Sequence, residues 1–190
     1  MILFTLNDEK AYGDQNYTHY VSNWAYSSLR AWMNDDFYNT AFDAEKSCIK
    51  NTSLKTPSLY RSPECDADPT NDNVFLLTWD DMVNLSYGFD PETSIGYRGR
   101  GTDYARCQGL EVDDLRDLSY WRLRTPLDYF STNYVHSLGC IDRSNSVSPK
   151  CATFGIRPAL YVNLQSAISQ SLIKKTDSSG TCCKRSVWNG

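Results

Sequence analysis

Apolar residues near the start of the chain recur at the spacing of a helix. Within residues 22–33 they fall on one helical face, which carries Trp24, Leu29, Trp32 and Met33. Ser22 or Asn23 can cap the first turn through its side-chain oxygen. The run 34–36 is rich in turn-forming residues, so it predicts the end of this helix. A second short helix is predicted over residues 37–49.

Short apolar runs bounded by turn-forming residues predict strands further along the chain. Residues 74–79 begin with four apolar residues and end with Thr78 and Trp79. A short apolar run of this kind, bounded by turn-forming residues, is typical of a buried strand. Residues 121–126 alternate and end at a proline, and a shorter strand is predicted around 134–135. Residues 154–162 form the last predicted strand, in which Pro158 indicates an edge or a bulge.

The remaining segments are polar and are expected to be loops. Residues 51–73 carry three prolines among many Ser, Thr, Asp and Asn, and residues 88–101 and 127–150 are loop-like. Residues 103–118 are mixed, and their candidates for the core are Tyr104, Leu110 and Leu115. The predicted helices come first in the chain and the short strands come later, and this order predicts an α+β fold with much irregular structure.

The apolar sides of the predicted elements indicate one shared core. Its expected members are Trp24, Leu29, Trp32, Phe75, Leu77, Trp121, Leu123, Ile156 and Leu160. Arg30 and Arg157 stand inside otherwise apolar phrases, so we expect structural roles for both. Each is expected to bond to backbone carbonyls or to a carboxylate such as Asp103.

Length and composition narrow the class of protein. The 190 residues point to one domain, and 41% hydrophobic with 22% charged residues is close to the globular average. The aromatic share of 13% suits either a compact, loop-rich body or a recognition surface, because Tyr and Trp supply large, rigid contact area. A formal charge of −4 argues against capture of nucleic acid or anionic lipid. No apolar run approaches the ~20 residues of a membrane span, and residues 1–6 are too short for a signal-peptide core.

Candidate chemistry is sparse. The G-x-S-x-G, G-x-x-x-x-G-K and H-E-x-x-H motifs are absent, and there are two histidines, His19 and His136. Seven cysteines leave at least one unpaired in a monomer, and a Cys140–Cys151 disulfide would tie the base of a loop. The same two cysteines with His136 could supply zinc ligands, although a loop histidine beside a structural cysteine is the preferred interpretation. The sequence therefore predicts no catalytic residues, no metal and no cofactor.

Two further patterns are interpreted as structural. Residues 96–101 resemble an arginine–glycine segment of RNA-binding tails, but a single copy in an acidic protein favours a turn. Several carboxylates could gather around calcium, but they lack the spacing of a calcium loop and are interpreted as solvated groups and helix caps. They are Asp80, Asp81, Asp90, Glu92 and Asp103.

Six phrases taken in order resemble an uncharacterised bacterial family, domain of unknown function 6273. The phrases lie at 23–34, 37–42, 72–77, 102–105, 120–126 and 155–160. The resemblance implies one domain over residues 20–164, with a lead-in at 1–19 and an extension, expected to be flexible, at 165–190. It implies no activity.

The closing phrases also resemble, more loosely, the C-type-lectin fold of the formylglycine-generating-enzyme kind. That resemblance implies two N-terminal helices packed on a small twisted antiparallel sheet with long loops. Residues 121–124 and 156–160 would be core strands, and the residues between them an exposed binding face. Bacterial and phage proteins of this kind include receptor-binding variable proteins diversified by retroelements.

Departures from that wider group favour binding without a metal. Its enzymatic branch uses a cysteine pair for copper, and Cys140 and Cys151 match by position only. The Glu-Pro-Asn and Trp-Asn-Asp phrases of calcium-dependent lectins are absent. Residues 125–149 contain no Lys, Glu, Gln, Trp or Met, the residue types that adenine-directed mutation of AAC codons cannot produce. A Ser/Asn/Tyr-rich loop gives the same composition without a retroelement.

The sequence thus predicts a non-catalytic module that binds a protein or carbohydrate on a cell or virion surface, in an extracellular or surface-associated setting. The alternatives are a metal-dependent oxygenase-like enzyme and a structural domain of a larger secreted protein. Ligand contacts are expected on a loop between two core strands, where side chains can vary without disturbing the core. They are Arg122, Asp128, Tyr129, Phe130, Ser131, Asn133, Tyr134, His136, Asp142, Arg143 and Asn145.

Overall fold

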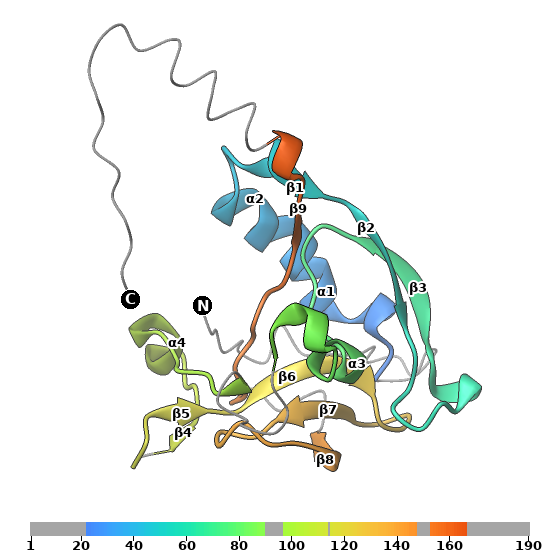
Figure 1. Ribbon diagram of the computed structural model, residues 1–190. Helices are drawn as coiled ribbons and strands as arrows, with labels where there is room; N and C mark the ends of the chain where they lie inside the picture. Colours follow the sequence, from blue (N-terminus) through green and yellow to red (C-terminus); the bar gives the residue numbers. More distant parts are fainter. Residues whose placement is uncertain (1–21, 90–96, 114, 148–152, 167–190) are drawn as a thin grey trace, which may run out of the picture.

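The computed structural model describes residues 22–89, 97–113, 115–147 and 153–166 (Figure 1). Within these ranges the chain is α+β, as predicted, and combines short helices with small antiparallel sheets. A three-stranded sheet of β6 (Trp121–Pro126), β7 (Thr132–Val135) and β8 (Ile141–Val147) lies at the bottom of Figure 1, and the N-terminal helices lie above it. The other sheets are two-stranded and pair β1 with β9, β2 with β3 and β4 with β5.

The predicted N-terminal helix exists, but its predicted end at residues 34–36 is wrong. The helical path continues through a π-helical turn, and the Asn34 side chain bonds to the distant residues 73 and 74. Its Oδ1 accepts from the backbone N–H groups of Asn73 (2.7 Å) and Val74 (3.2 Å), and its Nδ2 donates to Val74 O (2.8 Å). The elements are η2 (Trp24–Tyr26), α1 (Ser28–Trp32), η3 (Met33–Phe37), α2 (Tyr38–Ala41) and η4 (Lys46–Cys48).

The loop predicted over residues 51–73 is largely a hairpin, which corrects the sequence analysis. Strands β2 (Thr52–Thr56) and β3 (Ala67–Asp72) pair antiparallel, and η5 (Pro63–Cys65) lies between them. Asp72 is fully buried at the end of β3, where it accepts from Trp24 Nε1 (2.8 Å) and Arg30 Nε (2.7 Å). This strand is therefore anchored by polar contacts to the N-terminal helices, which an apolar pattern cannot reveal.

Residues 74–79 are buried in large part, but they form a single bridge, Phe75 to Ala159, rather than a strand. Helix α3 follows at once because Thr78 and Asp81 form a capping box around its first turn. Helix α3 spans Trp79–Met82. The elements after it are η6 (Leu85–Tyr87), α4 (Asp103–Cys107), β4 (Val112–Asp113) and β5 (Leu118–Ser119).

The predicted strand at 121–126 is confirmed as β6 (Trp121–Pro126), and the one around 134–135 as β7 (Thr132–Val135). Strand β8 (Ile141–Val147) lies in the segment predicted to be a loop. The predicted strand at 154–162 is broken into a parallel bridge from Trp121 to Gly155, the bridge to Phe75 and the short β9. Strand β9 (Tyr161–Val162) pairs with β1 (Ile49–Lys50).

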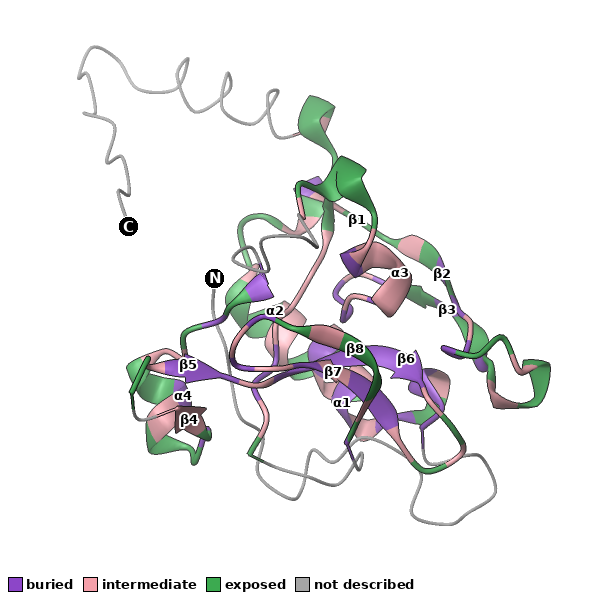
Figure 2. Ribbon diagram, turned by 60° about the horizontal axis from the view of Figure 1, so that its bottom comes forward, coloured by how far each residue is buried: buried purple, intermediate pink, exposed green. Residues whose placement is uncertain are grey.

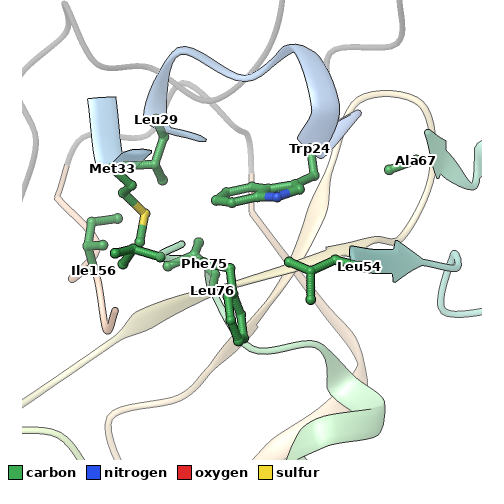
Figure 3. Packing of buried hydrophobic residues seen from close by; sticks show 9 residues of the cluster. Trp24, Leu29, Met33, Leu54, Ala67, Phe75, Leu76 and Ile156 are labelled. Carbon is green, nitrogen blue, oxygen red and sulfur yellow. The ribbon is translucent and has the colours of Figure 1, made fainter. Parts of the chain in front are cut away.

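Two hydrophobic clusters replace the single predicted core. Cluster 1 lies under the N-terminal helices (Figure 3) and contains Trp24, Leu29, Met33, Leu54, Ala67, Val74, Phe75, Leu76 and Ile156. Cluster 2 contains Met82, Tyr97, Ala105, Leu110, Trp121, Leu123 and Val135. Leu77 packs against both, whereas Leu160 belongs to neither. Tyr104 and Leu115 were expected in the core but are 61% and 90% exposed.

Strand β6 lies between the two clusters, and all six of its residues are buried (Figure 2). Trp121 and Leu123 belong to cluster 2. The Arg124 guanidinium carbon lies 5.4 Å from the ring centroid of Phe75 in cluster 1. This strand therefore supplies a rigid base for any side chain at its ends.

Arg30 and Arg157 are placed differently from the expected pairing with Asp103. Arg30 forms its ion pair with the buried Asp72 and donates to Ala25 O at 3.0 Å. Arg157 stacks on Trp121, with its guanidinium carbon 4.7 Å from the ring centroid. Its Nη1 is buried and has no hydrogen-bond partner among the described residues. Burial lowers the pKa of Arg157.

Candidate ligand-binding surface

Three aromatic rings, an imidazole and a guanidinium gather where β6 and β7 meet the chain at residue 154. We call this set the sheet-face cluster; its members are Tyr120, Arg122, Tyr134, His136 and Phe154. Arg122 pairs with Tyr134 across the two strands. Their neighbours Trp121 and Val135 point into cluster 2, so strand alternation turns the sheet-face cluster to the opposite side.

The rings of the cluster are in mutual contact. Tyr120 stacks on Phe154 with centroids 5.2 Å apart and meets His136 edge-on at 4.8 Å. Tyr134 meets Phe154 edge-on at 5.0 Å. All four rings are half-buried, which leaves part of each open to solvent. Ring pairs in these geometries stabilise one another, so the cluster is ordered before any ligand arrives.

Hydrogen bonds fix the orientation of His136. Its Nδ1 accepts from the backbone N–H of Leu138 at 3.2 Å, which places the proton of the neutral ring on Nε2. That nitrogen lies 3.5 Å from the Tyr120 hydroxyl. The turn around Gly139 (φ 84°) closes because the Gly139 N–H donates to His136 O at 2.8 Å.

Burial and charge give the cluster its electrostatic character. Burial raises the pKa of Tyr134, and the nearby Tyr120 adds to the shift, so Tyr134 stays neutral through the physiological range. Arg122 is buried, and its guanidinium carbon lies 5.8 Å from the Phe154 ring centroid. The cluster thus presents aromatic faces with a positive charge behind them.

Four of the predicted ligand residues form a separate turn between β6 and β7. The Leu127 N–H donates to Ser131 O at 2.9 Å, and the Phe130 N–H donates to Asp128 Oδ1 at 2.7 Å. Phe130 is 67% exposed. Ser22 Oγ donates to the carbonyl of Asp128, which ties the turn to the start of the described chain. The four residues are Asp128, Tyr129, Phe130 and Ser131.

Asn133 was expected to contact ligand, but it is fully buried. Its Nδ2 donates to Asp142 O at 2.9 Å and to Asn145 O at 2.7 Å. The register between β7 and β8 shifts at this point, and the Asn133 amide holds the resulting bulge of β8. This position therefore supports the surface from within and is corrected to a structural role.

The bulge, residues 142–145, carries the last three predicted residues, Asp142, Arg143 and Asn145. Asp142 Oδ1 accepts from the N–H and the hydroxyl of Ser144, both at 2.7 Å, and these bonds lower the pKa of Asp142. Arg143 contacts Trp79 rather than the sheet-face cluster.

The structure thus brings together three of the predicted residues, Arg122, Tyr134 and His136, and adds Tyr120 and Phe154. Tyr120 could have been found, because it precedes the predicted strand on the same side as Arg122. Phe154 enters through the parallel bridge between Trp121 and Gly155, for which the sequence carries no local signal.

Within the described ranges, no three His, Cys, Asp or Glu side chains gather as a metal site. Asp80 is held by Arg61 and Asp81 caps α3. Cys151, Asp90 and Glu92 lie outside the described residues, as do the disulfide, zinc and calcium arrangements that include them. None of the described helices has the length and hydrophobicity needed to cross a bilayer.

Comparison with known proteins gives one result. The model of the family described as Domain of unknown function (DUF6273) matches residues 3–164. No curated protein and no solved structure matches the chain.

Proposed function

Because the chain belongs to the DUF6273 family, whose description names no activity, we propose a function from its own surface. The protein is a non-catalytic binding module that recognises a protein or carbohydrate on a cell or virion surface. Its ligand contacts the sheet-face cluster. Its setting is extracellular or attached to a surface.

The observation that carries this proposal is the half-buried group of contacting rings formed by Tyr120, Phe154, Tyr134 and His136. Aromatic and Arg side chains dominate binding hot spots, because they bury large area with little loss of side-chain freedom. The opposite side of the same strands belongs to cluster 2, which holds these side chains in place. A ligand therefore meets a surface that is already organised, and this lowers the entropic cost of binding.

The geometry favours a ligand with a flat or ring-shaped apolar face and polar edges. Tyr134 and Phe154 offer ring edges and faces that are steeply inclined to each other, with an interplanar angle of 76°. The Tyr120 hydroxyl and His136 Nε2 lie side by side and can bond a hydroxyl or amide group. A sugar ring and an aromatic peptide side chain both have this character.

The test is binding of purified protein to two probes, an array of immobilised glycans and a displayed library of random peptides. Tyr134→Ala removes the ring that contacts both Tyr120 and Phe154, and we expect it to weaken binding to the selected probe by about tenfold or more. Tyr104→Ala is the matched control, because Tyr104 is 61% exposed on α4 and belongs to no part of the cluster.

Tyr104→Ala should keep the melting temperature of the parent protein, and Tyr134→Ala, which loses two ring contacts, should stay folded at the temperature of the assay. Binding retained by Tyr134→Ala, or binding lost equally in the two variants, contradicts the proposal. Absence of any probe that binds above background contradicts it as well.

A finer form of the proposal is that residues 125–160 are diversified by a retroelement. The support is the absence of Lys, Glu, Gln, Trp and Met from residues 125–149. The test is the gene's neighbourhood: a reverse transcriptase gene and a near-copy of this coding segment should be adjacent. Substitutions among isolates should fall at exposed positions such as Phe130, and equal variation at buried Asn133 contradicts the idea.

A further inference from the structure

Arg143 is an exposed charge on the bulge of β8, and its guanidinium group lies on an aromatic ring. The guanidinium carbon is 4.7 Å from the ring centroid of Trp79, the first residue of α3. This contact joins two elements that are far apart in the sequence. An arginine stacked in this way keeps its plane fixed while the N–H groups at its edge stay available.

The backbone around Arg143 is held from several directions. The Tyr60 hydroxyl donates to Arg143 O at 3.1 Å. Asn133 holds the carbonyls on either side, at Asp142 and Asn145. Trp79 is also fixed, because its backbone N–H donates to Thr125 Oγ1 at 2.8 Å. Both halves of the stacked pair are therefore preorganised.

Arg143 differs from Arg61 in having no partner for its charge among the described residues. Arg61 Nη2 donates to both carboxylate oxygens of Asp80 at 2.8 Å, so its charge is satisfied. Within the described residues the Arg143 guanidinium forms no ion pair and donates no hydrogen bond. It contrasts in the same way with Arg116, which pairs with Asp113 at 3.5 Å.

We propose that Tyr60, Trp79 and Arg143 form a carboxylate-binding site, which we call the Arg143–Trp79 site. The N–H fork of Arg143 binds both oxygens of one carboxylate, and the exposed ring of Tyr60 packs against the group that carries it. The carboxylate belongs to a sugar acid or to a peptide. This site is independent of the sheet-face cluster and does not rest on the function proposed for that cluster.

The surrounding charge favours a singly charged group. Asp142 adjoins Arg143 in the chain, and its pKa is lowered by the bonds from Ser144, so it is ionised at neutral pH. Asp80 lies next to Trp79, and Arg61 compensates its charge. A doubly charged phosphate would be repelled by Asp142 more strongly than a singly charged carboxylate, which needs only the one fork of Arg143.

The experiment is a titration of the full chain with sodium acetate, in which binding is monitored through the NMR resonance of the Arg143 Nε–H group. The ring current of Trp79 should separate this resonance from those of the other arginines. Acetate should shift it in a saturable manner, and acetamide, a neutral molecule of the same shape, should not. An equal response to sodium chloride would overturn the site, because it would indicate charge screening alone.

Two variants make the result specific. Arg143→Lys keeps the charge and removes the fork, so we expect it to bind acetate about tenfold more weakly. Binding to this variant is monitored through the ring resonances of Tyr60. Arg116→Lys is the matched control and should leave the acetate response unchanged. Acetate binding of unchanged strength in Arg143→Lys would overturn the proposal. The response should persist in Tyr134→Ala, so failure of the sheet-face cluster and failure of this site are distinguishable.

The source of the carboxylate follows from two larger probes, the methyl glycoside of N-acetylneuraminic acid and an acetylated dipeptide with a free carboxyl end. Tighter binding of the first than of acetate assigns a glycan, and tighter binding of the second assigns a protein. Loss of the response when the same dipeptide is amidated supports the site. A response that survives amidation contradicts it.

Discussion

Trp121 shows how much one side chain contributes at the residue scale. It is fully buried in cluster 2, its Nε1 donates to Tyr97 O at 2.8 Å, and Arg157 covers its ring. Trp121→Ala should therefore lower the free energy of unfolding by ~3–5 kcal/mol, because a buried aromatic leaves both lost contacts and a cavity. Chemical denaturation measures this loss. Leu115→Ala, at a position 90% exposed, is the control and should change little.

Asp72 plays the corresponding polar role in cluster 1. The carboxylate is fully buried and accepts from Trp24 Nε1, Arg30 Nε and Thr70 Oγ1. Asp72→Ala should cost ~3–5 kcal/mol of unfolding free energy, because it leaves several buried donors without an acceptor. Denaturation curves of Asp72→Ala and Asp68→Ala provide the comparison, since Asp68 is exposed. Equal stability of the two variants would contradict the network.

At the element scale, the bulge of β8 depends on Asn133. Removing its amide in Asn133→Ala leaves the carbonyls of Asp142 and Asn145 without their donor, at a cost of about 1–3 kcal/mol. Hydrogen exchange should accelerate at residues 141–147 more than at β6. Exchange that is unchanged along β8 would show that the bulge is held by other contacts.

A tyrosine pair links η6 to β9. The hydroxyls of Tyr87 and Tyr161 are 3.0 Å apart, and this bond, with some burial, raises the pKa of Tyr161 to about 12. In the unfolded chain Tyr161 loses its proton near pH 10. Between these values the folded state binds more protons, so stability should fall as the pH rises from about 10 to about 12.

Tyr87→Phe removes the partner hydroxyl and should move the pKa of Tyr161 back toward its ordinary value. Tyrosinate absorbance during an alkaline titration measures the change, with Tyr161→Phe identifying the signal. A pKa of Tyr161 that is the same in the parent protein and in Tyr87→Phe would assign the shift to burial alone.

The sequence predicted those elements whose cause is local. Alternation in residues 121–126 predicted β6, and alternation is a property of those residues alone. In the structure all six residues of that strand are buried, and the strand contacts both clusters. The sequence analysis missed β3, whose end is anchored by Asp72 to partners 48 and 42 residues away. It also missed the bulge of β8, because the burial of Asn133 depends on carbonyls that only the hairpin brings near.

The same distinction holds for the candidate surface. Arg122, Tyr134 and His136 could be placed near one another, because they lie on or directly after two strands that the sequence predicts. Phe154 could not, since it arrives through a parallel bridge from a distant segment. The arrival of Trp79 beneath Arg143 depends on the packing of α3 on the sheet, which no pattern within either segment predicts.

At the scale of the whole molecule, β6 decides whether the two clusters behave as one unit. Its Arg124 donates from Nε to Thr56 Oγ1 at 3.0 Å and from Nη1 to Leu76 O, and it lies over Phe75. The Arg124 N–H also donates to Leu77 O, and Leu77 packs against both clusters. Disruption of either cluster therefore exposes buried donors and acceptors of the other.

We accordingly expect one cooperative unfolding transition for the described part of the chain. Leu76→Ala acts in cluster 1 and Val135→Ala in cluster 2, and each should lower the midpoint of that single transition by an amount that corresponds to ~1–5 kcal/mol. Far-ultraviolet circular dichroism and tryptophan fluorescence should give coincident curves for both variants. Two separated transitions, with only one of them moved by each variant, would mean that Arg124 and Leu77 do not couple the clusters. Coupling through β6 is what makes the base of the sheet-face cluster as stable as the molecule itself.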